Sequence, residues 1–274
     1  MEKVDLLKKI ELEIFIEFKK ICDKNNLNYY ICAGTLLGAV RHNGFIPWDD
    51  DIDILMLRDD YERFIKIAQN ELPEYYFLQN VYTDPEFYFN FSKIRDNRTT
   101  FIETSSKNLN INHGVFIDIF PLDRFPRFCI DKIYIRLVER IANARISEYF
   151  ENNNNNKSMK DFIIKKISYA LFKTPKRAIF FKEKVYKKIN KKRGDLLKNY
   201  SGAWGNKEIV SEDYFKDITI LDFEGVQAKA PIYFDKYLTN LYGNYMKLPP
   251  IKEQVSHHYC ETIDLEKSYK EYGY

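Results

Sequence analysis

The sequence predicts an α+β fold in which a mixed β-sheet is flanked by helices. Residues 3–24 place apolar side chains at intervals of three and four, which is typical of an amphipathic helix. Residues 75–120 contain short β-branched and aromatic runs bounded by turn signals, which predicts several strands. Residues 127–200 return to a helical pattern rich in lysine, so we expect an added basic helical segment.

The first part of the chain alternates helices and strands. We expect a helix at 3–24, a short buried strand at 29–33, a helix at 35–42, an acidic strand at 51–57 and a helix at 60–71. Asp59 is followed three residues later by Glu62, the spacing of a capping box at the start of the last of these helices.

Later elements complete the sheet and add the basic segment. We expect strands at 77–82, 88–95, 99–103 and 115–120, a helix at 128–150, a loop at 152–156, two basic helices ending by residue 199, a β-hairpin at 218–230 and a helix at 231–241 that ends before Gly243. Beyond Pro250 we expect irregular structure. The chain thus divides into a core at 1–126, a helical basic segment at 127–200 and a C-terminal part at 201–274 that completes the core.

Acidic residues lie at the start of the strand expected at 51–57. Residues two apart on a strand point to the same side, so Asp51 and Asp53 share one face. Two carboxylates on a rigid strand suit a hard divalent cation such as Mg²⁺ or Mn²⁺. Asp118, on a later strand with apolar neighbours, would complete a three-carboxylate site, as a ligand or as a base. The alternative is that these acids are ordinary solvated turn residues.

Gly34 and Thr35 open the helix that follows the first short strand. Free backbone N–H groups at a helix N-terminus bind phosphate, and the Thr35 hydroxyl could add a further hydrogen bond. The combination favours metal-assisted phosphoryl transfer. An ordinary helix start is compatible with the same residues.

Four blocks of the chain resemble the LicD family. They are GTLLGAVRHNGFIPWDDDIDI at 34–54, KIRDNRT at 93–99, GVFIDIFPLD at 114–123 and YGNYMKLPP at 242–250. Fukutin-related phosphoribitol transferases are similar in the first block. The resemblance implies a nucleotidyltransferase-like fold and the transfer of phosphocholine from CDP-choline to a sugar hydroxyl of a cell-surface glycan or lipopolysaccharide precursor, with release of CMP. It also implies that Asp49 is a further metal ligand.

Four basic residues are candidate substrate contacts. Arg41 could form a forked contact with phosphate or pair with an aspartate, and His42 adjoins it. Lys93 and Arg95 lie two apart on a predicted strand and share a face, either toward donor or acceptor or toward solvent.

Trp48 is a candidate wall of an aromatic cage for a quaternary ammonium group, although packing beneath the acidic loop is the favoured interpretation. His257 and His258 match the C-terminal part of the LicD pattern, but the sequence indicates no role for them.

The net charge of +3 conceals a strong asymmetry, because residues 157–193 contain 14 Lys or Arg against two acidic residues. Such a basic helical stretch either lies on an anionic membrane surface or forms a solvated face. No nucleic-acid recognition motif lies beside it.

The four cysteines are scattered, no apolar run reaches the ~18 residues of a membrane span, and no signal peptide is evident, so we expect a cytoplasmic protein, at most at the inner face of the membrane.

Two other functions stay open. The same fold could transfer the nucleotidyl group itself, which would give pyrophosphate or a nucleotidylated acceptor in place of CMP. The acids could also be vestigial in a non-catalytic protein that binds a glycan or a membrane. The sequence leaves the acceptor sugar and the donor head group open.

Overall fold

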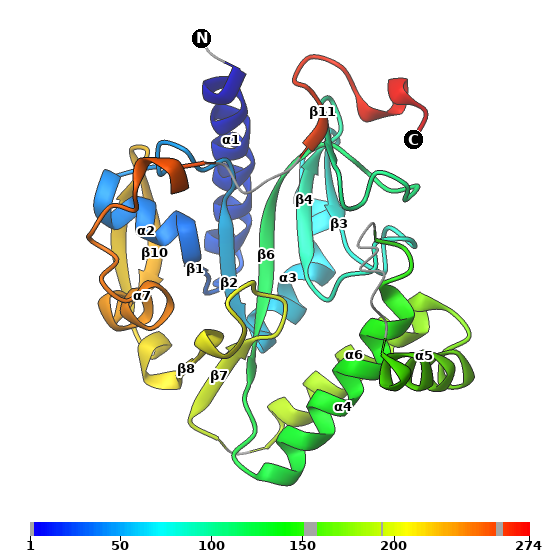
Figure 1. Cartoon of the computed structure of the whole chain (residues 1–274). Coiled ribbons are helices and arrows are strands. Elements are labelled where there is room, and N and C mark those ends of the chain that lie inside the picture. The colour runs from blue at the N-terminus through cyan, green and yellow to red at the C-terminus, as the bar shows by residue number, and fades with distance from the viewer. Residues whose placement is uncertain (1–2, 151–157, 193, 256–259) are drawn as a thin grey trace.

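A ten-residue strand, β6 (Val115–Arg124), is the centre of a seven-stranded mixed sheet (Figure 1). The computed structural model describes residues 3–150, 158–192, 194–255 and 260–274. The sheet order is β1–β2–β6–β4–β3, and β7 and β8 continue it beside the end of β6. Strand β2 is parallel to β6, whereas the other paired neighbours are antiparallel. The predicted α+β class is therefore confirmed.

The elements of the described residues alternate along most of the chain. The α-helices are α1 (Lys3–Lys24), α2 (Ala33–His42), α3 (Arg58–Glu71), α4 (Cys129–Ile146), α5 (Met159–Leu171), α6 (Pro175–Asn190) and α7 (Phe234–Tyr242). The strands besides β6 are β1 (Tyr30–Ile31), β2 (Asp53–Leu57), β3 (Tyr76–Gln79), β4 (Ser92–Asp96), β5 (Thr100–Glu103), β7 (Leu196–Asn199), β8 (Ile209–Ser211), β9 (Ile218–Phe223), β10 (Val226–Pro231) and β11 (Cys260–Asp264). Short 3₁₀ helices are η1 (Gly205–Glu208), η2 (Glu212–Phe215), η3 (Ile251–Glu253) and η4 (Tyr269–Tyr272).

Helices α1 and α3 pack together against the sheet (Figure 1). The apolar spacing in residues 3–24 directs Ile14, Phe18 and Ile21 into the core, as predicted. Phe18 of α1 and Phe64 of α3 are fully buried, and their ring centroids lie 5.0 Å apart. This layer supports β2 and β6 from behind and makes them a rigid platform.

The hairpin β9–β10 lies at the β1 edge of the sheet and braces the segment that follows α2. Its turn residues Glu224 and Gly225 both have positive φ, 52° and 76°, and the Glu224 carboxylate accepts a hydrogen bond of 3.0 Å from the Phe45 N–H. The hairpin predicted at 218–230 is confirmed, as is the end of α7 at Gly243, whose φ is 70°.

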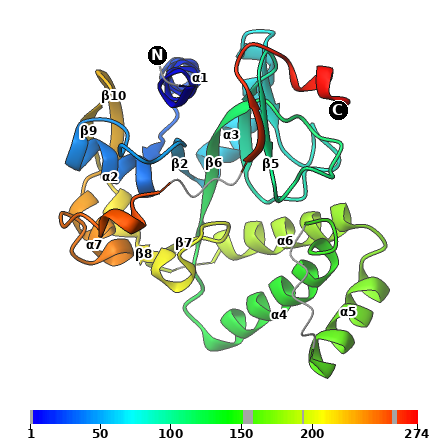
Figure 2. The same ribbon diagram turned by 45° about the horizontal axis from the view of Figure 1, so that its top comes forward.

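Helices α4, α5 and α6 form a helical lobe beside the end of β6 (Figure 2). Helices α4 and α6 share a small core of their own, made of Ile135, Val138, Val185, Tyr186 and Ile189. Asp123 of β6 joins the lobe to the sheet, since its carboxylate accepts from Arg58 of α3, at 2.8 Å, and from the Asn190 side chain of α6.

The start of α3 differs from the prediction. The helix begins at Arg58 with Leu57 at its N-cap position, and no side chain caps it, so the expected capping box of Asp59 and Glu62 is wrong. Glu62 pairs instead with Arg58 and with Lys187 of α6. The buried ion pair between Arg58 and Asp123 directs the chain here, and a local capping rule cannot include that distant partner.

Strand boundaries also differ. Strand β2 begins at Asp53, so Asp51 lies in the approach to it, and β6 continues through Pro121 to Arg124. The end of the chain is not irregular throughout, because β11 pairs with β5 and Tyr269 of η4 donates to the Thr99 carbonyl. The loop expected at 152–156 lies outside the described residues. The division into three segments stays a prediction, although β7, from the end of the basic segment, joins the main sheet.

Candidate active site

The parallel pairing of β2 with β6 places Asp53 directly opposite Asp118. The Asp118 N–H donates to the Ile52 carbonyl at 2.9 Å, which fixes this register. In-register residues of parallel neighbours point to the same face of a sheet. Accordingly Asp51, Asp53 and Asp118 line one cavity of about 610 Å³. Their roles in metal binding and catalysis stay predictions.

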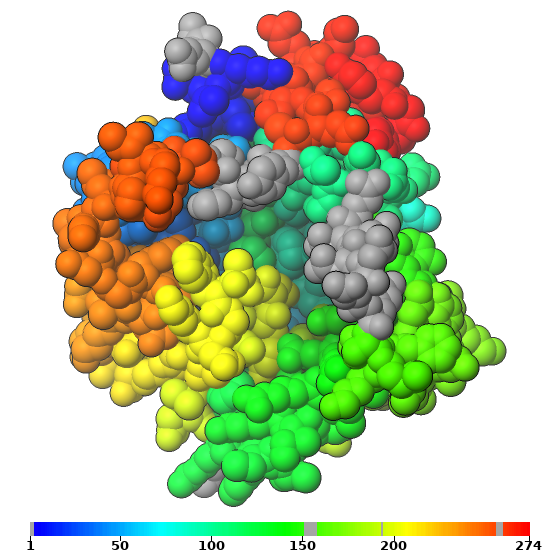
Figure 3. All heavy atoms as spheres, viewed as in Figure 1, coloured from blue at the N-terminus to red at the C-terminus, as the bar shows by residue number. Residues whose placement is uncertain are grey.

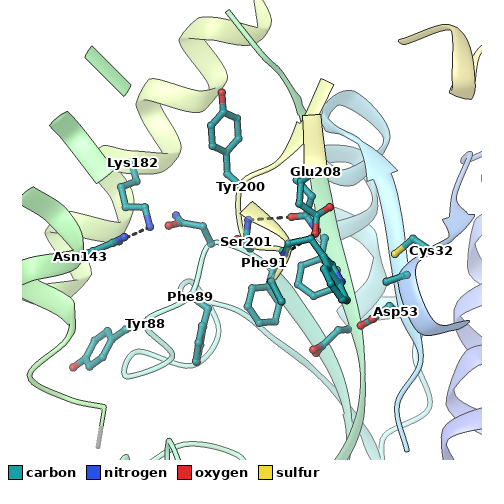
Figure 4. A pocket seen from close by; sticks show the side chains of 18 of the residues that line it. Cys32, Asp53, Tyr88, Phe89, Phe91, Asn143, Lys182, Tyr200, Ser201 and Glu208 are labelled. Carbon is teal, nitrogen blue, oxygen red and sulfur yellow. Dashed lines mark hydrogen bonds between the residues drawn. The ribbon is translucent and has the colours of Figure 1, made fainter. Parts of the chain in front are cut away.

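The cavity lies between the sheet and the helical lobe. Asp53 and Cys32 stand on one side of it and Lys182 with Asn143 on the other, while residues 199–204 cross one end (Figure 4). On the molecular surface it opens as a hollow between the yellow segment near residue 200 and the green helices (Figure 3). The lobe therefore forms the wall that faces the carboxylates.

The N-terminus of α2 points at the acidic segment. Cys32 occupies the N-cap position without a side-chain hydrogen bond, so no side chain caps the first turn. A Cβ at Gly34 would overlap Asp49 Oδ2, so glycine at this position leaves room for the carboxylate beside the helix end. The Thr35 hydroxyl is buried and accepts a hydrogen bond of 2.8 Å from the Asp53 N–H. The structure thus ties Gly34 and Thr35 to the aspartates, and phosphate binding by them stays a prediction.

Lys93 and Arg95 lie on one face of β4, as their spacing predicts, and both reach Glu103. Lys93 Nζ is 3.0 Å from Asp118 Oδ1 and 3.5 Å from Glu103 Oε1. Arg95 has an exposed fraction of 0% and donates to Gln79, Glu103 and the Gly114 carbonyl. The Arg95 guanidinium is thus enclosed by protein acceptors, and its contact with substrate stays a prediction.

Arg41, His42 and Trp48 form a separate cluster and do not line the cavity. Arg41 donates to the Tyr245 carbonyl at 2.9 Å and to His42 Nε2 at 2.9 Å, and its guanidinium lies over the Trp48 ring. Burial and then the Arg41 charge lower the pKa of His42, in agreement with a neutral ring that accepts this hydrogen bond. The forked phosphate contact of Arg41 and the aromatic cage considered for Trp48 stay predictions. His257 and His258 lie outside the described residues.

Comparison with known proteins agrees with the motif pattern. Residues 26–141 match the family model described as LicD/FKTN/FKRP, nucleotidyltransferase domain. The chain is 32% identical over 261 residues to the lipopolysaccharide cholinephosphotransferase LicD of Haemophilus influenzae, and the match covers 93% of this chain and 95% of the relative. The protein belongs to the LicD family.

Shorter matches lie in uncharacterized proteins of two Rickettsia species. One is 52% identical over 48 residues to a protein of Rickettsia typhi, covering 18% of this chain and 16% of the relative. The other is 56% identical over 41 residues to a protein of Rickettsia prowazekii, covering 15% of each.

Two ionisable residues of this LicD-family cavity were missed by the sequence analysis. Burial raises the pKa of Glu208 to about 7, and its Oε1 accepts a hydrogen bond of 3.3 Å from the Trp204 N–H. Burial lowers the pKa of Lys182 to about 8, and its Nζ donates to Asn143 Oδ1 at 2.9 Å (Figure 4). Lys182 was one of 14 basic residues in its segment, and nothing local distinguished Glu208.

Aromatic rings form a large part of the cavity lining. Phe91 packs against Phe120 with ring centroids 4.7 Å apart, and Phe89 contacts Phe150 at 5.0 Å. Further rings in the lining are Tyr88, Tyr200, Trp204 and Tyr237. These rings come from other elements than Trp48, the residue considered for an aromatic cage.

The carboxylates supply the oxygen atoms that hard divalent cations take as ligands. Among the residues that the structure describes, no three His, Cys, Asp or Glu side chains converge closely enough to form a finished metal cluster. Asp51, Asp53 and Asp118 nevertheless share one cavity, and their oxygen donors are of the kind that Mg²⁺ and Mn²⁺ prefer. The residues fit a divalent cation in chemistry, with Lys93 beside Asp118 in the present arrangement.

Proposed function

We propose that this LicD-family protein transfers phosphocholine from CDP-choline to a hydroxyl of a lipopolysaccharide or other glycan precursor in the cytoplasm, releasing CMP. The observation that carries the proposal is the pairing of Asp53 with Asp118 at a cavity walled by aromatic rings. The similarity to a lipopolysaccharide cholinephosphotransferase over most of both chains supports it. The family description supports a nucleotidyltransferase-like core for the sheet and its helices.

Asp51, Asp53 and Asp118, with Asp49 beside them, would hold Mg²⁺ or Mn²⁺. Such an ion supplies charge neutralisation to a pyrophosphate and to a departing phosphate oxygen. Lys182 reaches the cavity from α6 opposite these acids, so it is placed to contact donor phosphate.

Glu208 is the residue that we assign to proton transfer. A general base works best with a pKa near the working pH, and Glu208 meets this condition whereas an ordinary carboxylate does not. The acceptor hydroxyl attacks the choline-bearing phosphorus, the bond from that phosphorus to the CMP oxygen breaks, and the hydroxyl proton passes to Glu208. Asp118, for which the sequence left the roles of ligand and base open, is assigned to the metal because it already lies in a charged pair with Lys93.

The trimethylammonium head group would lie against the rings of Tyr88, Phe89 and Phe91. Quaternary ammonium ions are attracted to aromatic faces, and a walled cavity excludes the water that would otherwise compete for the cation. Trp48 lies outside this cavity lining.

The test is a product assay with purified protein, Mg²⁺, CDP-choline and a choline-free lipopolysaccharide acceptor. The proposal predicts CMP and a phosphocholine-bearing acceptor, both abolished by Asp53→Asn. Asp59→Asn, an exposed carboxylate on α3, is the matched control and should retain activity. Pyrophosphate or a nucleotidylated acceptor would show nucleotidyl transfer instead, and activity unchanged in Asp53→Asn would contradict the assigned site.

A further inference from the structure

Helix α5 has an apolar face that no other part of the described chain covers. Ser168 is the one residue of α5 that is buried. Met159, Phe162, Ile163, Ile167 and Leu171 keep exposed fractions between 40% and 75%. A helix on a globular surface ordinarily turns its apolar stripe to the core, so this helix is oriented for contact with something outside the chain.

The N-terminal half of α4 shows the same feature. Ile130, Ile133, Tyr134 and Leu137 follow the i, i+3, i+4, i+7 spacing of one helix stripe and are 71%, 59%, 42% and 53% exposed. The buried side of α4 faces α6 through Ile135 and Val138, so this exposed stripe is not part of the lobe core.

The two stripes adjoin one another. Arg140 of α4 pairs with Asp161 at the start of α5, at 3.4 Å, and the Arg145 guanidinium lies 4.5 Å from the ring centroid of Tyr169. Helix α5 therefore packs beside the C-terminal half of α4 and leaves the N-terminal stripe of α4 open next to it (Figure 2). We call the combined surface the α4–α5 face; its residues are Ile130, Ile133, Tyr134, Leu137, Met159, Phe162, Ile163, Ile167 and Leu171.

The charge of the lobe that carries the α4–α5 face, much of it on α6, indicates the kind of partner that this face fits. Residues 158–192 carry 12 Lys or Arg against two acidic residues. Lys160 and Lys166 are exposed among the apolar residues of α5, and the Lys166 ammonium lies 4.6 Å from the Phe162 ring centroid. A second copy of this chain would bring two strongly positive lobes together, whereas an anionic lipid surface complements both the charge and the apolar side chains.

We infer that the α4–α5 face docks the protein on an anionic membrane surface, with its apolar side chains in the head-group region and its lysines against lipid phosphates. Helix α4 also contributes Asn143 and Ser147 to the cavity lining. Docking through α4 therefore holds the cavity close to the lipid surface, where a lipid-anchored acceptor would lie. Only this last consequence rests on the proposed function.

Vesicle flotation of the full chain tests the inference without donor or acceptor. Vesicles of phosphatidylcholine alone are compared with vesicles that contain about 30 mol% phosphatidylglycerol. The protein should float with the anionic vesicles and not with the neutral ones, and NaCl raised from about 0.1 M to about 1 M should weaken binding because it shortens the screening length. Leu137→Glu and Ile163→Glu should each reduce binding at least tenfold.

Ile220→Glu is the matched control, since Ile220 is a 49% exposed apolar residue on β9, away from the lobe. It should bind vesicles like the unmodified protein, and all three variants should unfold at the same temperature because the altered positions are exposed. Equal binding by Leu137→Glu, Ile163→Glu and the control would overturn the inference. An absence of vesicle binding would also overturn it. If light scattering then shows a dimer that Leu137→Glu dissociates, the α4–α5 face would be an interface between two copies of the chain. Vesicle binding by a protein that releases no CMP would leave this inference standing and reject the proposed function alone.

Discussion

Lys93 Nζ lies 3.0 Å from Asp118 Oδ1 and 3.3 Å from the Phe116 ring centroid, on the strand next to β6. With an exposed fraction of 3%, this lysine is held behind a carboxylate that faces the cavity. Its charge offsets part of the negative charge that Asp51, Asp53 and Asp118 concentrate there. A divalent cation in the cavity would take over that role.

Lys93→Met should therefore show a metal-dependent loss of stability. Removing one partner of a buried ion pair costs about 3–5 kcal/mol, and we expect a loss of that order in EDTA. Saturating Mg²⁺ should restore more stability to Lys93→Met than it adds to the unmodified protein. Urea unfolding with and without Mg²⁺ measures both quantities, and Lys66→Met, at an exposed position of α3, is the control. An equal loss of stability with and without Mg²⁺ would show that Lys93 and the metal do not balance the same negative charge.

The raised pKa of Glu208 predicts a stability change with pH. A carboxyl group whose pKa is about 7 in the folded chain and 4.5 when unfolded favours folding in its protonated form. Its contribution is intact below pH 4.5 and is lost as the pH rises to about 7. Glu208→Gln should thus be more stable than the unmodified protein by about 1–3 kcal/mol at pH 8, with little difference at pH 4.5. Denaturant unfolding at the two pH values measures this, and a difference that does not change with pH would contradict the assignment.

Glu208→Gln should also lose activity, since Gln cannot accept the proton. A general base contributes about 10²–10⁴-fold, so we expect kcat to fall by at least about 100-fold. The rise of kcat with pH near 7 should disappear in the variant. A preserved pH profile would show that another group takes the proton.

Substitution by alanine should have different effects at two glycines of α2. Gly34→Ala places its Cβ on the side-chain carboxylate of Asp49, which can shift more easily than backbone, so we expect a smaller loss of stability than for Gly38→Ala and at least a tenfold loss of Mg²⁺ affinity. Gly38→Ala places its Cβ on the Gly44 carbonyl, which is backbone and cannot move away cheaply, so this variant should be destabilised by about 1–3 kcal/mol. Thermal unfolding and Mg²⁺ titration separate the two cases. An unchanged Mg²⁺ affinity in Gly34→Ala would mean that Asp49 has no part in the site.

Lys182→Ala should raise the KM for CDP-choline by about 10- to 100-fold, because a hydrogen bond to a charged group contributes about 1.5–3 kcal/mol. In the unmodified protein, donor affinity should fall as the pH passes about 8, where Lys182 loses its proton. Lys184→Ala, an exposed lysine on the same helix, should behave normally. A normal KM in Lys182→Ala would place the donor phosphates elsewhere.

The placement of Asp53 and Asp118 on buried strands could be predicted because it depends on local properties. Apolar neighbours identify both segments as buried strands, although Asp51 precedes β2 and its place is not explained by strand alternation. The pairing of the two strands, which sets Asp53 opposite Asp118, is not encoded in either segment alone. Lys182, Glu208 and the aromatic wall could not be predicted in the same way. They reach the cavity only because the helical lobe and residues 199–208 fold against the sheet, and no local pattern encodes that packing. Arg95 illustrates the reverse case, since its spacing placed it correctly beside Lys93 but could not reveal that Gln79 and Glu103 enclose it.

The most direct test of the account is the thermal stabilisation of the protein by Mg²⁺ and CDP-choline together. A ligand that binds only the folded state raises the melting temperature. The unmodified protein and Asp59→Asn should show a rise that needs both ligands, and Asp53→Asn and Asp118→Asn should show none. In EDTA, Asp118→Asn should start from a lower melting temperature because it removes one partner of the buried Lys93–Asp118 pair. The same Mg²⁺-dependent rise in Asp53→Asn and Asp118→Asn would contradict the claim that these paired aspartates hold the metal and the donor.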